Sequence, residues 1–151
     1  MSPDNPVEKK THDVLVIDDD PETLDILKAL LSRYEFNVTV EPDPRKAIGR
    51  VTQERFAVVL TDIIMPEMSG LEVLKEILDY HRATQVILMT GYGTVDKVLD
   101  AYGLGASDYI YKPFTDLDEV VDAVRRGATR FDRWYAAITR CLKQKKGTDE
   151  S

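Results

Sequence analysis

Short apolar runs alternate along the chain with longer segments in which apolar residues recur every three or four positions. The short runs are rich in Val, Ile and Thr and are predicted to be β-strands at residues 13–17, 37–40, 57–61, 85–90 and 108–111. Helical periodicity is found between them, over residues 24–31, 47–51, 71–78 and 95–102. Several strands are apolar on both faces, which is typical of a parallel sheet covered by helices on each side. The pattern predicts a doubly wound α/β domain with a five-stranded parallel sheet.

A fifth helical segment begins near residue 117 and is much longer than the others. Its apolar positions continue through residue 142 and include Phe131, Trp134 and Tyr135, which lie beyond the part needed to cover the sheet. We expect an extended C-terminal helix whose outer part, 128–145, is a linker or a dimerisation helix. The alternative is that this part folds back and buries the aromatic residues against its own domain. Gly127 could mark a bend, because glycine weakens a helix by about 1 kcal/mol relative to alanine.

The composition restricts the kind of protein. The chain has 151 residues, of which 43% are hydrophobic and 31% charged, as in one globular domain. No apolar run approaches the roughly 20 residues that span a bilayer, and the single Cys141 cannot form an internal disulfide. We therefore expect a cytoplasmic protein without membrane contact. The polar ends, residues 1–11 and 146–151, are expected to be a disordered arm and a disordered tail.

The net charge of −7 is unevenly distributed. Residues 125–146 contain eight Lys or Arg and a single Asp, so this segment carries +7 and the remaining residues carry −14. An acidic body argues against direct nucleic-acid binding by this chain. The basic segment is a possible contact surface for a partner.

Four of the predicted strands end at a charged or hydroxyl side chain. Asp18 and Asp19 follow the first strand, Asp62 the third, Thr90 ends the fourth and Lys112 follows the fifth. The carboxyl ends of parallel strands lie at one edge of the sheet, where ligands bind in such folds. Clustered carboxylates repel one another unless a cation is present. An oxygen-rich ligand set suits Mg²⁺, which would neutralise charge on a phosphoryl group transferred to Asp62.

Four motifs, in this order and at this spacing, resemble those of response regulator receiver domains, the CheY-like domains of two-component signal transduction. They are "VLVIDDD", "LTDIIMPEMSGLEVL", "VILMTGYGT" and "GASDYIYKPF", within residues 12–127. The resemblance implies a flavodoxin-like receiver fold with strand order 2-1-3-4-5 and five flanking helices. It implies a phosphoprotein that a sensor histidine kinase or a phosphotransfer protein phosphorylates. Such a domain is not an enzyme with turnover and catalyses only its own phosphoryl transfer and dephosphorylation.

The resemblance also implies a role for each residue of the site. Asp62 would accept the phosphoryl group in a Mg²⁺-dependent reaction. Asp18, Asp19, Asp62 and the backbone carbonyl of Ile64 would bind the metal. Lys112 would contact the phosphate.

Two further residues would transmit the change, Thr90 as the switch hydroxyl and Tyr109 as an aromatic ring that changes rotamer. The alternative for Tyr109 is an ordinary core residue, since aromatic residues are common in strands. The switching surface would be built from the helix at 95–102, the strand at 108–111 and the last helix. The rim of the site would include Pro66, Gly91 and Pro113, and the Lys112–Pro113 bond is typically cis in such receivers.

The output is expected to be contact with a partner or an output domain. "TGYGTVDKV" and the long final helix resemble receivers attached to ATPase-type transcription activators. Two copies of the chain could also pair, through the switching surface or through the last helix.

The phosphorylated lifetime is expected to be long. Receivers that lose phosphate quickly often have a polar side chain two residues after the acceptor, where it can orient a water molecule. Here that position is Ile64, and Tyr92, two residues after Thr90, could restrict access. We therefore expect slow self-dephosphorylation.

Two other functions fit parts of the sequence. "DDDPET" contains the Asp-x-Asp of haloacid-dehalogenase-like phosphohydrolases, which also form an aspartyl-phosphate, but Pro21 and Glu22 replace that family's Gly and Thr or Val. "GYGTVD" resembles a dinucleotide-binding loop, but Asp96 replaces its third glycine. Asp20 matches no metal position and is predicted to cap the first helix, with Pro21 in its first turn.

Overall fold

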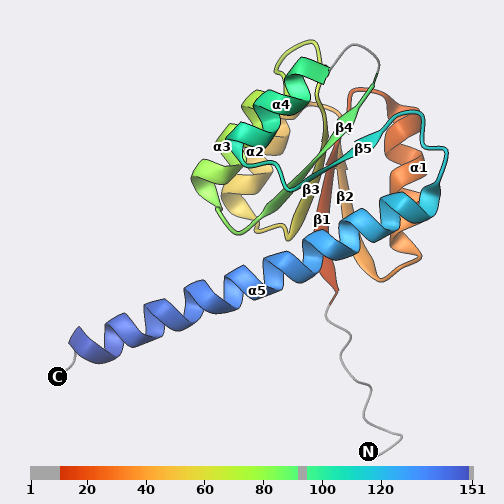
Figure 1. Cartoon of the computed structure of the whole chain (residues 1–151). Helices are drawn as coiled ribbons and strands as arrows, with labels where there is room; N and C mark the ends of the chain where they lie inside the picture. Colours follow the sequence, from red (N-terminus) through yellow and green to blue (C-terminus); the bar gives the residue numbers. More distant parts are fainter. Residues whose placement is uncertain (1–10, 92–94, 150–151) are drawn as a thin grey trace, which may run out of the picture.

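The computed structural model describes residues 11–91 and 95–149, which form a parallel sheet with helices on both faces (Figure 1). The strands are β1 (His12–Ile17), β2 (Phe36–Glu41), β3 (Val58–Asp62), β4 (Gln85–Thr90) and β5 (Asp108–Tyr111). The helices are α1 (Pro21–Ser32), α2 (Pro44–Gln53), α3 (Gly70–Tyr80), α4 (Val95–Leu104) and α5 (Leu117–Asp149). The sheet order is β2-β1-β3-β4-β5, so the predicted fold and strand order are confirmed. Most of the arm expected at residues 1–11 lies outside the described residues.

The alternation of side chains along the strands gives the domain two cores. In β1, Val14 and Val16 belong to a core shared with α1 and α5, whereas Leu15 and Ile17 belong to a core shared with α2, α3 and α4. All four residues have no exposed surface. Figure 1 shows the same division, with α1 and α5 on one face of the sheet and the other three helices on the opposite face. Burial on both faces explains why the inner strands β1, β3 and β4 lack an alternation of polar and apolar residues.

Short polar residues begin four of the helices, including α5, where the Asp116 carboxylate accepts a hydrogen bond from the Asp118 amide at 3.0 Å. The Asp20 carboxylate accepts a hydrogen bond from the Glu22 amide at 3.1 Å, and Pro21 occupies the first turn of α1, which confirms the predicted cap. Asp43 and Ser69 cap α2 and α3 in the same way. A cap of this kind typically contributes about 1 kcal/mol to stability, because it satisfies an amide that has no partner within the helix.

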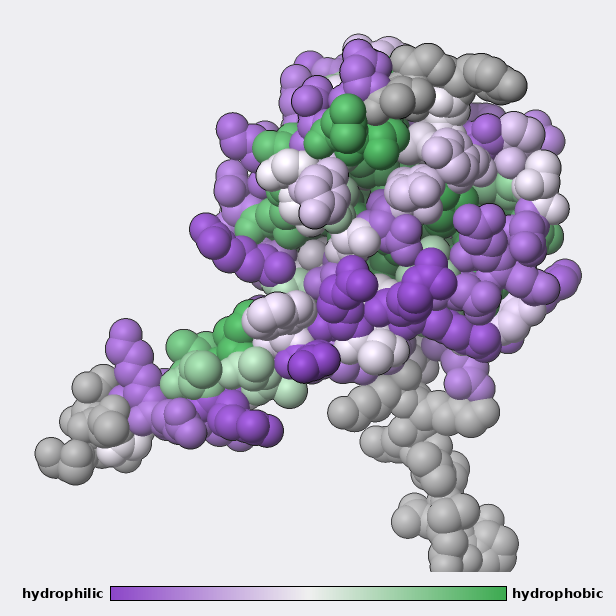
Figure 2. Space-filling model, viewed as in Figure 1, coloured by the Kyte–Doolittle hydropathy of each residue, from purple (hydrophilic) through white to green (hydrophobic). Residues whose placement is uncertain are grey.

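Helix α5 extends well beyond the sheet as one continuous helix of 33 residues (Figure 1). Phe131 packs at the edge of the core, but the exposed fractions of Trp134 and Tyr135 are 57% and 39%. The alternative in which this part folds back to bury its aromatic residues is therefore wrong. Figure 2 shows apolar residues gathered on α5 just outside the domain, with polar residues nearer its end.

Two contacts fix the direction in which α5 leaves the domain. The Arg55 guanidinium donates a hydrogen bond to the Tyr135 hydroxyl at 2.9 Å and lies 4.9 Å from the centre of the Tyr135 ring. On another side, His12 Nε2 lies 2.9 Å from the Asp132 carboxylate. Each contact joins a residue of the projecting part of α5 to a residue of the domain more than 75 positions away in the sequence. Together they hold the start of the projecting part against the domain.

Two expectations about α5 need correction. The helix continues through Gly127 without interruption, and the missing side chain instead permits close packing, because a Cβ atom there would lie 3.1 Å from the Val58 side chain. The tail expected at residues 146–151 is helical through Asp149. Lys and Gln are good helix formers, and basic residues near the C-terminal end of a helix interact favourably with its dipole. Within the described parts of the chain, no helix is both long and apolar enough to cross a bilayer.

The start of α3 demands a glycine. The Gly70 amide donates to the Ile63 carbonyl at 2.8 Å, and a Cβ atom at Gly70 would lie only 2.2 Å from the Asp62 carbonyl oxygen. Both contacts are to backbone, which cannot move aside as a flexible side chain could. Gly70 therefore holds the chain that follows Asp62 close to the end of β3.

We predict that Gly70→Ala destabilises the protein by about 2 kcal/mol, in the range typical of overpacking. The matched control is Gly49→Ala within α2, where a Cβ atom meets nothing within 4 Å. This control is expected to stabilise the protein by roughly 0.5–1 kcal/mol, because alanine favours the helix. Urea unfolding measures both, and equal effects of the two substitutions would contradict the role given to Gly70.

Candidate functional site

The register of the sheet brings the predicted site residues to one edge. Ile17, the last residue of β1, pairs with Thr61 of β3, so Asp18 and Asp62 follow on neighbouring strands. On the other side of β3, Asp62 pairs with Met89, which precedes Thr90. The Lys112 amide donates to the Thr90 carbonyl at 2.7 Å, which holds the residue after β5 beside the end of β4.

Three carboxylates meet at this edge. One oxygen from each of Asp18, Asp19 and Asp62 lies within 4.8 Å of the others, a group that could hold a metal ion. Asp18 is completely buried, Asp62 is partly buried and Asp19 is exposed, so the group opens to solvent on one side. The backbone helps to fix Asp18, whose carboxylate accepts a hydrogen bond from the Asp20 amide at 2.9 Å.

Lys112 provides positive charge within this group. Its ammonium forms an ion pair and hydrogen bond with Asp18 Oδ2 and lies 3.4 Å from Asp62 Oδ2. Asp62 is held more loosely, since its other oxygen accepts from the Ile64 amide, also at 3.4 Å. Asp18 is thus the anchored carboxylate of the site, and Asp62 is the one with weaker contacts.

Burial and the neighbouring charges shift the pKa values of Asp18 and Lys112. Burial raises the pKa of the Asp18 carboxyl above its ordinary value, and the nearby Asp62 charge adds to this, although Lys112 and the Asp20 amide act in the opposite direction. Burial by itself would lower the pKa of Lys112, but the hydrogen bond to Asp18 and the two carboxylate charges outweigh it and raise the pKa. Lys112 therefore stays charged at neutral pH, while the carboxylates still favour a further cation.

The predicted switch residues occupy distinct positions. Thr90 is buried, and its hydroxyl donates to the Ile110 carbonyl at 3.4 Å rather than to a carboxylate of the site. Tyr109 is 45% exposed and its ring packs edge-on against Tyr111, with ring centres 5.2 Å apart. The alternative of a core residue does not describe Tyr109.

The rim residues surround this edge on several sides. Pro66 lines a cavity of about 190 Å³ together with Asp19, and Pro113 lines another together with Lys112. The Lys112–Pro113 bond is cis, as expected. Gly91 directly follows β4, and Tyr92 lies outside the described residues.

Sequence reasoning missed two features. The first is the direct pairing of Lys112 with Asp18, although a buried carboxylate after β1 already called for a cation. The second is Glu41, a buried carboxylate at the end of β2 that forms an ion pair with Arg50 at 3.2 Å. A charged residue directly after the alternating run at 37–40 was the available signal. Glu41 is the last residue of the edge strand β2 and pairs with Ile17, which precedes Asp18. It is not one of the three clustered carboxylates.

Comparison with protein families gives one match that covers most of the domain. The family model described as response regulator receiver domain matches residues 14–125. A response regulator receiver domain protein from Clostridium thermocellum has the same fold, with a TM-score of 0.77 and 29% identity over 82% of this chain and 98% of that one. These matches favour a receiver over a haloacid-dehalogenase-like phosphohydrolase.

Curated relatives are longer proteins. Transcriptional regulatory protein ZraR of Escherichia coli (strain K12) is 40% identical over 129 residues, which are 84% of this chain and 29% of that protein. DNA-binding transcriptional regulator NtrC of Salmonella typhimurium is 35% identical over 118 residues, which are 78% of this chain and 25% of that protein. The chain thus spans less than a third of these relatives. Together with the fold, the matches show that this chain belongs to the response regulator receiver domains of two-component systems.

Proposed function

We propose that residues 12–127 receive a phosphoryl group on Asp62 from a sensor histidine kinase or a phosphotransfer protein. The observation that carries this proposal is the convergence of three carboxylates, with oxygens within 4.8 Å of one another, on an edge where Lys112 already bridges two of them. A structural ion pair needs only one carboxylate for each lysine. The excess of anionic oxygen supports a site that operates with a second, divalent cation.

The residues present fit Mg²⁺. Asp18, Asp19 and Asp62 would supply carboxylate oxygens and Ile64 its backbone carbonyl, which are the hard ligands this ion prefers. When bound, the ion would neutralise charge on the phosphoryl oxygens. The open side at Asp19 leaves room for water and for the incoming group.

The transfer itself is a displacement at phosphorus. An Asp62 oxygen forms a bond to phosphorus while the bond from phosphorus to the donor histidine nitrogen breaks, and that nitrogen keeps the electron pair. Two features of the chain support Asp62 in this role, namely its weaker contacts and its position within reach of the Lys112 ammonium. After the transfer, the Lys112 ammonium would bind the negatively charged phosphoryl oxygens.

A rearrangement of the α4-β5-α5 surface would transmit the signal. The hydroxyl of Thr90 would leave the Ile110 carbonyl and donate to the phosphoryl group, and Tyr109 would turn inward. Space for this movement is available, because Tyr109 lines a largely apolar cavity of about 300 Å³ between α4 and β5. The neighbouring α4 residues Leu99 and Tyr102 are 71% and 82% exposed, which makes the surface suitable for a partner.

The projecting part of α5, residues 128–145 and the turn beyond, would carry the output. Its exposed apolar residues suit pairing with a second copy or packing against an output domain. The basic charges of the same segment would favour an acidic partner. DNA binding is stated in the name of NtrC, and any such activity would belong to a part outside this chain's receiver domain.

We predict that the protein, incubated with Mg²⁺ and acetyl phosphate, gains the mass of one phosphoryl group. The gain should disappear in Asp62→Asn or when the metal is chelated. Asp20→Asn is the matched control, because asparagine caps a helix as well as aspartate does and Asp20 lies outside the three clustered carboxylates. Labelling that persists in Asp62→Asn would refute the assignment, as would sustained turnover of p-nitrophenyl phosphate by the unmodified protein.

We also predict that Ile64→Asn shortens the phosphorylated lifetime several-fold. The Ile64 side chain is 56% exposed beside Asp62, so an amide at this position can orient a water molecule for attack on phosphorus. Intact mass followed over time after removal of acetyl phosphate measures the decay. Ile138→Asn, on the exposed part of α5, is the control for a similar loss of apolar surface, and an unchanged or slower decay in Ile64→Asn would count against the explanation.

A third prediction concerns competition between Lys112 and the metal. Lys112→Met leaves the buried Asp18 without its ion-pair partner, so the protein should lose about 3 kcal/mol of stability in EDTA. Added Mg²⁺ should restore more stability to this variant than to the unmodified protein, because binding to the folded state stabilises it. Urea unfolding with and without Mg²⁺ measures both effects.

The control for that experiment is Lys28→Met, which removes an exposed lysine from α1. It should change neither the stability in EDTA nor the response to Mg²⁺ by more than about 0.5 kcal/mol. If Mg²⁺ stabilised Lys112→Met no more than Lys28→Met, the metal would not be bound by the carboxylates that Lys112 contacts.

A further inference from the structure

Another cavity, open to solvent, lies at the opposite end of the sheet from the clustered carboxylates. It has a volume of about 650 Å³ and is enclosed by the end of α3, the loop from α4 to β5 and the start of the projecting part of α5. Thr84, Gln85 and Ser107, which lie at the amino ends of β4 and β5, form its floor. The Ser107 hydroxyl donates to the Gln85 side chain at 2.7 Å, and the Thr84 hydroxyl donates to the Phe56 carbonyl at 2.7 Å. The floor is therefore polar and already fixed by internal hydrogen bonds.

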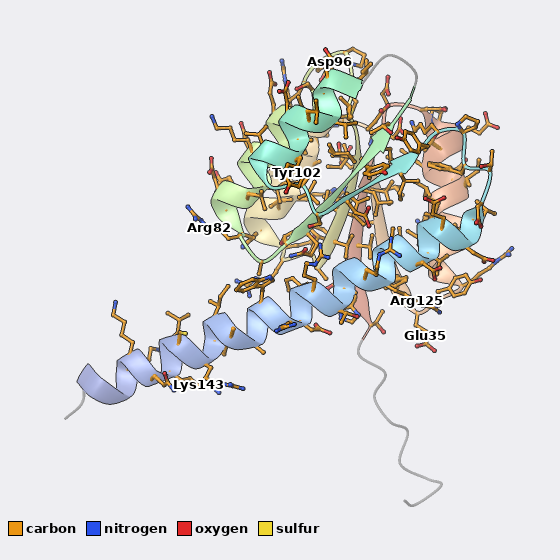
Figure 3. All side chains as sticks on the ribbon, viewed as in Figure 1. Glu35, Arg82, Asp96, Tyr102, Arg125 and Lys143 are labelled. Carbon is orange, nitrogen blue, oxygen red and sulfur yellow. The ribbon has the colours of Figure 1, made fainter. Side chains whose placement is uncertain are left out.

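Positive charge predominates in the walls. Lys75, Arg82 and Arg130 line the cavity, with Asp79 as the one acidic residue among its lining. In the described part of the chain, the side chains of Lys75 and Arg82 have no hydrogen bond or ion pair, and the Arg130 side chain makes one long contact with the Ser107 carbonyl at 3.4 Å. Figure 3 shows Arg82 at the end of α3, on the side from which α5 projects. A net charge of +2 among these four residues is unusual in a domain whose body is acidic, and it favours an anion.

An aromatic ring lies beside these charges. Trp134 lines the same cavity from α5 and is 57% exposed, and Tyr102 lines it from α4. Within the described residues, the Trp134 ring has no aromatic or cationic partner. An exposed indole next to arginines provides a face on which a flat ring can stack while the arginines bind a negative group.

We propose that this cavity binds a small organic anion that carries an aromatic ring, with the ring against Trp134 and the negative charge between Arg82 and Arg130. Nucleoside monophosphates and aromatic carboxylates both have this chemistry. Such a ligand would join α3 to α5 and hold the projecting helix in one direction. The proposal does not depend on phosphorylation of Asp62, because the two sites lie at opposite ends of the sheet.

The indole N–H of Trp134 allows a direct test, because the chain contains a single tryptophan. Its NMR signal would be followed in the full chain, without Mg²⁺, as adenosine monophosphate or indole-3-acetate is added. Adenosine and inorganic phosphate serve as probes for the ring and the charge alone. We expect at least one of the two ring-bearing anions to give a saturable shift, at about tenfold lower concentration than either adenosine or phosphate. Which of the two anions binds distinguishes a nucleotide from a carboxylate ligand.

Arginine variants locate the binding. Arg82→Gln and Arg130→Gln should each raise the dissociation constant about tenfold, since each removes a charge-assisted hydrogen bond. Arg45→Gln, which removes an exposed arginine from α2, is the matched control and should leave it unchanged. The proposal fails if neither ring-bearing anion shifts the Trp134 signal saturably, if phosphate alone binds as tightly, or if the Arg82 and Arg130 variants bind like the Arg45 variant.

Discussion

Repulsion among carboxylates at one edge of the sheet is the constraint on which the domain's chemistry depends. Asp18 is buried and cannot turn toward water, and Asp62 lies on the neighbouring strand, so their charges cannot separate. Lys112 satisfies part of this charge from a third strand and thereby links β1, β3 and β5 at their ends. The remaining negative charge is balanced by no other ion pair in the described residues. Such a cluster favours a cation close to it, and among the described residues that cation is the Lys112 ammonium.

The rest of the site follows from that constraint. The Asp20 amide is held toward Asp18 because Asp20 itself caps α1, so the cap and the acidic site share one turn of chain. On β3, Gly70 lets the chain after Asp62 return against the end of the strand, where a side chain would separate them. The same few backbone contacts therefore position both the helix starts and the clustered carboxylates. Lys112, 50 positions from Asp62, and Gly70, eight positions from it, both contact Asp62 directly or through its backbone.

Helix α5 runs from one face of the sheet into solvent. Its first half covers one face of the sheet, and Gly127 permits the close contact with Val58. Its second half carries aromatic and basic side chains into solvent, yet Arg55 and His12 fix the direction at which it leaves. The cavity lined by Arg82 and Trp134 lies where α5 passes the opposite end of the sheet. A change in the direction of α5 would therefore change the shape of this cavity. The clustered carboxylates and the cavity lined by Lys75, Arg82 and Arg130 lie at the two ends of one sheet.

The amino-acid sequence alone determined the fold class, the strand order through its family resemblance, and the residues of the acidic site, because burial patterns and strand-end residues are local properties. The cap of α1 by Asp20, with Pro21 in the first turn, could be predicted for the same reason. Three features depended on tertiary structure. The pairing of Lys112 with Asp18 joins residues 94 positions apart, and only the parallel register of β1, β3 and β5 brings them together. The role of Gly127 depended on how closely α5 packs on Val58. Whether α5 folds back or projects depended on contacts from Arg55 and His12, since an amphipathic stripe has the same periodicity in either case.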